Sequence, residues 1–128
     1  MDRTNLNSLS KVILDAAFVV HKEMGPGLLE AVYEFCMMRE FQLRGIMAES
    51  QVAVPIFYKG HPLGKEFRID ILVEREIIIE IKAVDLILPV HKAQIISYLK
   101  LTGITLGFLI NFNVSLLKEG FSRFVCNF

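Results

Sequence analysis

The first third of the chain carries apolar residues at helical spacing. Residues 5–23 and 28–44 repeat them at intervals of three and four positions, which predicts two helices. The segment Gly25-Pro26-Gly27 is expected to separate these helices, because glycine and proline interrupt helical structure. Gly45 is expected to end the second helix, since glycine readily adopts the left-handed conformation that often follows a helix.

The middle of the chain changes to strand-like patterning. Residues 51–58, 66–73 and 77–83 are rich in β-branched and aromatic residues, which predicts three strands. Residues 59–64 have the composition of a turn, and Glu74-Arg75-Glu76 is a charged connection between the second and third strands. Side chains alternate along a strand, so the second strand should present its odd-numbered apolar residues on one face. These residues are Phe67, Ile69, Ile71 and Val73.

The last third predicts one more helix and two strands. Residues 90–102 are expected to be helical, with Pro89 at the start and Gly103 at the end. Residues 104–111 form an apolar run typical of a strand buried on both faces, and residues 120–126 predict an edge strand. The order of elements, ααβββαββ, predicts an α/β fold in which helices flank a mixed β-sheet.

Composition narrows the class of protein. The chain has 128 residues, a length typical of one domain, here residues 1–128, and its 53% hydrophobic content excludes a disordered chain. The mean hydropathy of +0.47 raises the question of a membrane protein, but no apolar stretch approaches the ~20 residues of a spanning helix. The first eleven residues lack the apolar core of a signal peptide, so we expect a cytoplasmic protein without a membrane partner.

Positive and negative side chains balance, with 14 Lys and Arg against 14 Asp and Glu. A protein that coats nucleic acid is usually basic, so this balance argues against that class. It does not exclude an enzyme that meets nucleic acid through a local patch.

Two acidic residues on the second and third predicted strands are expected to lie side by side. A hairpin with the three-residue loop Glu74-Arg75-Glu76 places Asp70 opposite Glu80 and makes the apolar faces coincide. A two-residue loop would instead pair Asp70 with Ile79 and place a charge among isoleucines. Directly opposed residues have Cβ atoms about 5 Å apart, where two negative charges repel by about 3 kcal/mol at an effective dielectric of about 20.

A divalent cation would relieve this repulsion, and Mg²⁺ or Mn²⁺ suits a site of one or two carboxylates and water. Lys82 should point to the same side of its strand as Glu80, where it could position an attacking water. The alternative is that Lys82 and Arg68 neutralise the two acids in a surface salt-bridge cluster. The pattern alone leaves both interpretations open.

Both neighbouring helices carry polar residues that could line the same cleft. Glu30, Tyr33 and Glu34 share one side of the second predicted helix. A polar stripe on the third helix is separate from its apolar residues and consists of His91, Gln94 and Tyr98. The alternative interpretation of such a stripe is a solvated helix face.

The segment Gly27-Leu28-Leu29-Glu30-Ala31-Val32-Tyr33 matches the signature G-x-x-E-x-x-Y and resembles the GxxExxY family. The resemblance covers the chain from about residue 10 to about residue 125. The other segments that resemble this family are residues 21–27, 67–70, 80–84, 91–94, 97–100 and 109–113. The family is similar to a compact branch of the PD-(D/E)XK nuclease superfamily.

This resemblance implies a restriction-endonuclease-like core and a phosphodiester hydrolase that depends on Mg²⁺ or Mn²⁺. It implies that the metal ligands are Asp70, Glu80 and the main-chain carbonyl of Ile81. The catalytic residues that it implies are Lys82, Glu30, Gln94 and Tyr98, with Glu30 completing the metal shell. Further candidates for contacts with the substrate are Arg68, His91 and Tyr33.

The function expected from the sequence is therefore that of a metal-dependent nuclease, with DNA preferred over RNA as the substrate. The alternative is a catalytically inactive module of the same fold that binds nucleic acid or a protein partner. The apolar, β-rich segment at residues 121–128 also predicts a homodimer.

Overall fold

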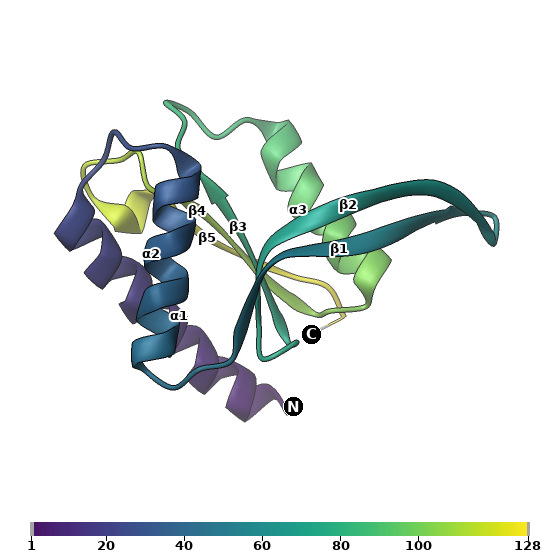
Figure 1. Ribbon diagram of the computed structural model, residues 1–128, viewed down its shortest axis with the longest axis horizontal. Helices are drawn as coiled ribbons and strands as arrows, with labels where there is room; N and C mark the ends of the chain where they lie inside the picture. The colour runs from purple at the N-terminus through teal and green to yellow at the C-terminus, as the bar shows by residue number, and fades with distance from the viewer. Residues whose placement is uncertain (1, 128) are drawn as a thin grey trace.

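Five strands form one mixed sheet, and their order across the sheet follows their order along the chain (Figure 1). The computed structural model describes residues 2–127. The strands are β1 (Ala48–Tyr58), β2 (His61–Val73), β3 (Ile77–Lys82), β4 (Leu106–Asn111) and β5 (Phe121–Val125). Strands β3 and β4 run parallel, whereas the other neighbouring pairs run antiparallel.

The helices are α1 (Arg3–Met24), α2 (Glu30–Leu43) and α3 (Pro89–Thr102), and Leu117–Glu119 form a short 3-10 helix. The predicted order of elements and the α/β fold with a mixed sheet are therefore confirmed. Gly103 ends α3 with φ of 76°, the left-handed conformation for which glycine is suited. Within residues 2–127, none of the helices combines the length and apolar composition that crossing a membrane requires.

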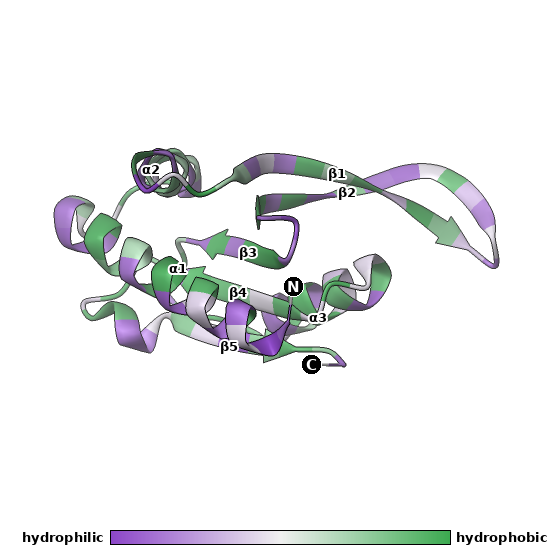
Figure 2. Ribbon diagram, turned by 90° about the horizontal axis from the view of Figure 1, so that it is seen from below, coloured by the Kyte–Doolittle hydropathy of each residue, from purple (hydrophilic) through white to green (hydrophobic). Residues whose placement is uncertain are grey.

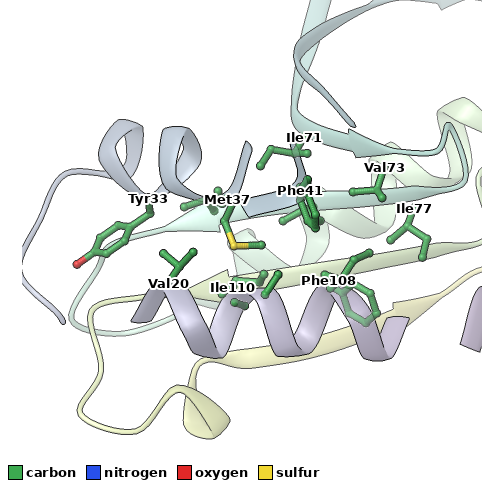
Figure 3. Packing of buried hydrophobic residues seen from close by; sticks show 14 of the residues in the cluster. Val20, Tyr33, Met37, Phe41, Ile71, Val73, Ile77, Phe108 and Ile110 are labelled. Carbon is green, nitrogen blue, oxygen red and sulfur yellow. The ribbon is translucent and has the colours of Figure 1, made fainter. Parts of the chain in front are cut away.

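Hydrophobic side chains on the two faces of the sheet form separate clusters. One cluster packs α1 and α2 against the sheet and includes Tyr33, Phe41 and Phe108 (Figure 3). The other packs α3 against the opposite face through Ile95 and Leu99. The helices are thus the outer layers and the sheet is the middle layer.

Strand β3 contributes to both clusters. Ile77, Ile79 and Ile81 pack with α1 and α2, whereas Ile78 packs with α3. Burial on both faces is typical of a strand with a parallel neighbour. Glu80 lies in this apolar strand with only 3% of its surface exposed, so the fold places an acid where little water reaches it.

Tyr33 belongs to the core and holds the connection between α1 and α2. Its hydroxyl donates to the carbonyl of Gly25 at 2.6 Å and accepts from the N–H of Leu28 at 3.1 Å. Its ring stacks on Phe112 with centroids 4.5 Å apart, and its side chain is 0% exposed. The expected contact between Tyr33 and a substrate is therefore wrong, because burial removes this side chain from the surface.

The chain that follows β3 is fixed by Asn111 at the end of β4. The Asn111 amide accepts from the N–H of Val84 at 3.1 Å and donates to the carbonyl of Val84 at 2.9 Å. Next to it, the carbonyl of Lys82 accepts from the N–H of Phe112 at 3.0 Å. These bonds hold the main chain on which Lys82 is mounted.

The β1–β2 hairpin is longer than the rest of the sheet and extends beyond it as an arm, which we define as residues 52–68 (Figures 1 and 2). Lys59 and Gly60 form its turn, with φ of 49° and 80°. Two left-handed residues in succession characterise a type I′ turn, whose twist matches that of the flanking strands. The turn is therefore shorter than the predicted residues 59–64, and β2 begins at His61.

A β-bulge interrupts the arm near its tip. Pro55 pairs with Glu66, but Phe57 pairs with Pro62, so one residue of β1 lies against three residues of β2 in this interval. Such a bulge turns the end of a hairpin relative to its base. Gly64 lies within this bulge. Its turn-like character belongs to the bulge, and this made the predicted turn too long.

The predicted alternation along β2 holds only up to Asp70. Asp70 lies opposite Gln51, whose φ of 53° is in the left-handed region, and the strand pair turns there. The residues on the two sides of this turn pack in different clusters. Ile71 and Val73 lie on the side of α1 and α2, whereas Phe67 and Ile69 lie on the side of α3. The prediction that all four share one face is therefore wrong.

We expect the substitution Tyr33→Phe to lower the free energy of unfolding by about 1 kcal/mol, because two main-chain groups lose their hydrogen bond to the hydroxyl while the stacked ring remains. Urea denaturation followed by circular dichroism measures this change. The matched control is Tyr58→Phe, since the Tyr58 side chain is 62% exposed and its hydroxyl should matter little. Equal stability of the two variants would contradict the structural role of the Tyr33 hydroxyl.

Candidate active site

Asp70 and Glu80 meet where β2 separates from β3. The ladder between these strands consists of the pairs Val73–Ile77, Leu72–Ile78 and Ile71–Ile79, the register predicted for the three-residue loop. One step beyond the ladder, Asp70 Oδ2 accepts from the N–H of Ile81 at 2.8 Å, and Glu80 Oε1 accepts from the N–H of Asp70 at 3.3 Å. Carboxylate oxygens therefore replace the carbonyls that would have continued the ladder.

The pKa of Glu80 is raised from 4.5 to about 9, and burial is the largest cause. The negative charge of Asp70 and a hydrogen bond between the two carboxyl groups also contribute to this rise, whereas the N–H of Asp70 and the Lys82 ammonium act in the opposite direction. Two acids in contact, one of which is buried, cannot both ionise at modest cost. Without a cation, the pair therefore holds one proton at neutral pH.

An acidic cleft of about 320 Å³ opens between α2 and this point of the sheet. Its lining residues are Glu30, Ala31, Glu34, Gln51, Asp70 and Ile81. Glu30 is the first residue of α2, where a negative charge is favoured by the helix dipole. The predicted metal ligands Asp70 and Ile81 and the predicted helical acid Glu30 thus border one cleft.

Glu34 and Gln51 connect α2 to Asp70. The Gln51 amide donates to Glu34 at 2.7 Å and to Asp70 Oδ1 at 3.5 Å, of which the second is a weak bond. Burial raises the pKa of Glu34, and the charge of Asp70 raises it further, while the bond from Gln51 lowers it. The negative charge of Asp70 therefore acts on Glu34 across the Gln51 amide.

Sequence reasoning did not single out Gln51, and it assigned no role to Glu34. Gln51 reaches Asp70 because the register places it opposite, and that register depends on the bulge in the arm. Continued from the turn without a bulge, the pairing of Tyr58 with His61 would have placed Gln51 opposite Arg68. The one signal in the sequence was the position of Glu34 one helical turn after Glu30.

A second cleft, of about 440 Å³, lies beside α3 and contains Lys82. We call it the lysine cleft; its lining residues are Lys82, Val90, His91, Ala93, Gln94 and Ser97. His91 closes the start of α3, since its Nδ1 accepts from the N–H of Leu88 at 3.0 Å. Lys82 and Ile81 are consecutive in β3 and point to opposite faces, so the two clefts lie on opposite sides of the strand.

Gln94 and Tyr98 form a pair one helical turn apart on α3. The Gln94 amide donates to the Tyr98 hydroxyl at 2.9 Å, and the Tyr98 ring stacks on Phe67 of β2 with centroids 4.1 Å apart. Burial raises the pKa of Tyr98, and the charges of Glu80 and Asp70 raise it further. These two side chains therefore face the sheet near the acid pair and do not form a solvated stripe.

Arg68 does not neutralise the acid pair. Its guanidinium donates to the carbonyl of Gln51 at 3.3 Å and pairs with Glu66 at 3.2 Å, at the base of the arm. Lys82 lowers the pKa of Glu80, but this effect is the smallest of those that act on it. Of the two cations in the alternative salt-bridge interpretation, Arg68 therefore bonds elsewhere and Lys82 acts only weakly on Glu80.

The donor atoms at the acid pair fit a divalent cation that prefers oxygen. Asp70 and Glu80 supply two carboxylates, and the Ile81 carbonyl lies on the same side of β3 as the Ile81 N–H that binds Asp70, beyond the end of the ladder. Residues 2–127 contain no group of three His, Cys, Asp or Glu side chains arranged to hold a metal. The remaining positions would belong to water, a coordination that Mg²⁺ commonly retains.

A family model described as the PD-(D/E)XK nuclease superfamily matches residues 7–124. Nucleases of this superfamily generally use divalent metal ions. No curated protein and no solved structure matches the chain. The matched region contains every residue of the two clefts and of the acid pair.

In metal-free buffer, the acid pair should make the protein less stable as the pH rises. Glu80 keeps its proton up to about pH 9 in the folded state but loses it near 4.5 in the unfolded chain, so the folded state binds more protons between these values. The free energy of unfolding then falls with pH by at most about 1.4 kcal/mol per unit. Glu80→Gln removes this contribution, so its stability relative to the wild type should increase from pH 5 to pH 8.

Urea denaturation at several pH values in EDTA measures this difference. The control is Glu23→Gln, because Glu23 is an exposed residue of α1. A stability difference between Glu80→Gln and wild type that stays constant with pH would show that Glu80 titrates normally.

Proposed function

We propose that this chain, which belongs to the PD-(D/E)XK nuclease superfamily, hydrolyses phosphodiester bonds of nucleic acid with the help of Mg²⁺ or Mn²⁺. The observation that carries the proposal is the contact between the buried carboxyl group of Glu80 and the half-buried Asp70, held at the separation of β2 and β3 with Lys82 two residues from Glu80. Such a pair is costly for stability when it has no cation to bind. The placement of Glu80 in the core, against Asp70 at the edge of the acidic cleft, therefore supports a catalytic use.

In this proposal, Asp70, Glu80 and the Ile81 carbonyl hold the ion, and Glu30 and Glu34 contribute negative charge across the acidic cleft. The chemistry that a divalent ion supplies in such a site is stabilisation of charge on the phosphate and a lower pKa of water. Glu80 must release its proton for the site to be charged. The Gln51 amide keeps Asp70 and Glu34 apart while remaining bonded to both.

Lys82 offers a positive charge on the side of β3 to which Glu80 also points, where a phosphate that develops charge would be stabilised. Gln94 shares the lysine cleft with Lys82 and fixes the Tyr98 hydroxyl, so this pair orients the lysine side of the site. His91 at the rim of this cleft and Arg68 at the base of the arm are the proposed phosphate contacts. DNA is proposed as the preferred substrate.

Within the superfamily, we infer membership of the GxxExxY group. Each of the three signature residues, Gly27, Glu30 and Tyr33, has a distinct structural role, and these roles support this assignment. Gly27 has φ of 99°, which glycine tolerates in the connection before α2. Tyr33 holds that connection through its hydroxyl, and Glu30 faces the acidic cleft. The signature would then describe a structural clamp that presents one acid to the site.

Purified protein should cut DNA in the presence of Mg²⁺ or Mn²⁺ and stop in EDTA. Lys82→Ala should lower the cleavage rate by about 100-fold or more, because it removes a charge placed for the transition state. Gel electrophoresis of labelled single- and double-stranded DNA and RNA measures the rate. The control is Lys11→Ala, the same change at an exposed site of α1. Equal cleavage by both variants would refute the role of Lys82.

Binding of Mn²⁺ near pH 7.5 should release about one proton, because the ion requires the ionised form of Glu80. Calorimetric titration in two buffers with different ionisation enthalpies measures this number. Glu80→Gln should release none, whereas the exposed control Glu23→Gln should behave as the wild type. Proton-coupled binding of Mn²⁺ without any cleavage would favour the inactive binding module over the nuclease.

A further inference from the structure

The tip of the hairpin arm is an exposed apolar and basic surface that the proposed catalytic step does not use. Every residue from 57 to 66 is exposed, and the large apolar side chains Phe57, Tyr58 and Leu63 are 55%, 62% and 49% exposed. In Figure 1 this end of β1 and β2 lies far from the helices α1 and α2. The tip therefore adds little to the core, and packing does not explain why its apolar side chains are present.

The tip is built as a stiff structure. The type I′ turn at Lys59 and Gly60 fixes the two strands, and Tyr58 pairs directly with His61, so their side chains share one face. The ammonium of Lys59 lies over the Tyr58 ring, 5.5 Å from its centroid. A flat aromatic ring is thus presented to solvent together with a positive charge.

The charge of the arm suits a polyanion. Lys59, Lys65 and Arg68 against Glu66 give residues 52–68 a net charge of +2, whereas the whole chain is neutral. The rest of the chain is therefore net negative, and the arm is where a nucleic acid would be attracted. Because Pro55 and Pro62 lack an N–H group, the arm is also poorly suited to pair with a strand of another protein.

The base of the arm is joined to the acid pair. Phe67 stacks on Tyr98, Arg68 donates to the carbonyl of Gln51, and Asp70 follows on the same strand. From Asp70 to His61 the strand runs nine residues, a span of at most about 30 Å. A nucleic acid strand bound in the acidic cleft could therefore continue along the arm to its tip.

We propose that the arm binds nucleic acid and that the Tyr58 ring at its tip stacks on an unpaired base, so that the preferred substrate contains a single-stranded stretch. This inference rests on the proposed function for the identity of the partner. Stacking on an aromatic side chain accepts any base, because each base has a π-face. A base inside a duplex exposes only its edges, so a tip of this kind favours single strands.

The test is binding of fluorescein-labelled 20-nucleotide DNA in EDTA, measured by fluorescence anisotropy, so that cleavage and metal binding play no part. Single-stranded DNA should bind at least tenfold more tightly than a blunt duplex of the same length. Tyr58→Ala should weaken binding of the single strand by about tenfold. Phe35→Ala is the matched control, since Phe35 is a 72% exposed aromatic residue of α2.

A second variant tests the charge of the tip. Replacing both Lys59 and Lys65 by Ala should reduce the slope of log K against log[salt] by about 1.4, since each lost phosphate contact contributes about 0.7 on single strands. Replacing Lys11 and Lys22 of α1 by Ala should leave the slope unchanged. Circular dichroism of each variant shows that it is folded.

The outcomes separate the arm from the catalytic site. Unchanged binding by Tyr58→Ala, or equal affinity for the duplex, would overturn the proposal even if the wild type cuts DNA. Weaker binding by Tyr58→Ala in a protein that never cleaves would support the arm and refute only the nuclease. A halved mass of Tyr58→Ala in light scattering would overturn the proposal, because the tip would then join two copies of the chain.

Discussion

The structure depends on the contact between a buried acid, Glu80, and a half-buried acid, Asp70, that borders an open cleft. Asp70 and Glu80 occupy the place where β2 would otherwise continue to pair with β3, and each accepts a hydrogen bond from the main chain of the opposite strand. The separation of the strands opens the acidic cleft beside Asp70, and the carboxyl groups compensate for the ladder bonds that the separation removes. The same side chains therefore fix the backbone and, in the proposed function, hold the metal ion.

The arrangement of the acid pair could be predicted from the sequence because it depends on local rules. The three-residue loop and the isoleucines on both sides of it allow only one register in which no charge lies among apolar residues. Gln51 could not be predicted, since its position opposite Asp70 depends on a bulge near Pro55 that leaves no clear pattern in the sequence. Tyr33 was misinterpreted for another reason. A tyrosine on a polar helix side resembles a surface residue, until the fold supplies Phe112 as a stacking partner from the other end of the chain.

Strand β3 divides the chemistry between two faces. Ile81 and Asp70 border the cleft beside α2, whereas Lys82 borders the cleft beside α3, so the Asp70 carboxylate and the Lys82 ammonium open into different clefts. A lysine beside Asp70 within one cleft would form an ion pair and neutralise the acids that a metal requires. Alternation along β3 turns the Ile81 side chain toward α2 and the side chains of Glu80 and Lys82 toward α3, so Lys82 shares its side of the strand with Glu80 and lies away from the cleft that Asp70 borders.

The position of the acids along the chain also affects how the molecule reaches its native state. Asp70 and Glu80 belong to one hairpin, whereas β4 joins β3 only after a crossover of 23 residues. Contacts between nearby residues form faster than distant ones, so the acids approach each other while water still surrounds them and both are ionised. Their repulsion then opposes closure of the hairpin at neutral pH. Protonation of Glu80, whose pKa before burial is 4.5, removes this repulsion, so closure of the hairpin is expected to become easier as the pH falls toward that value.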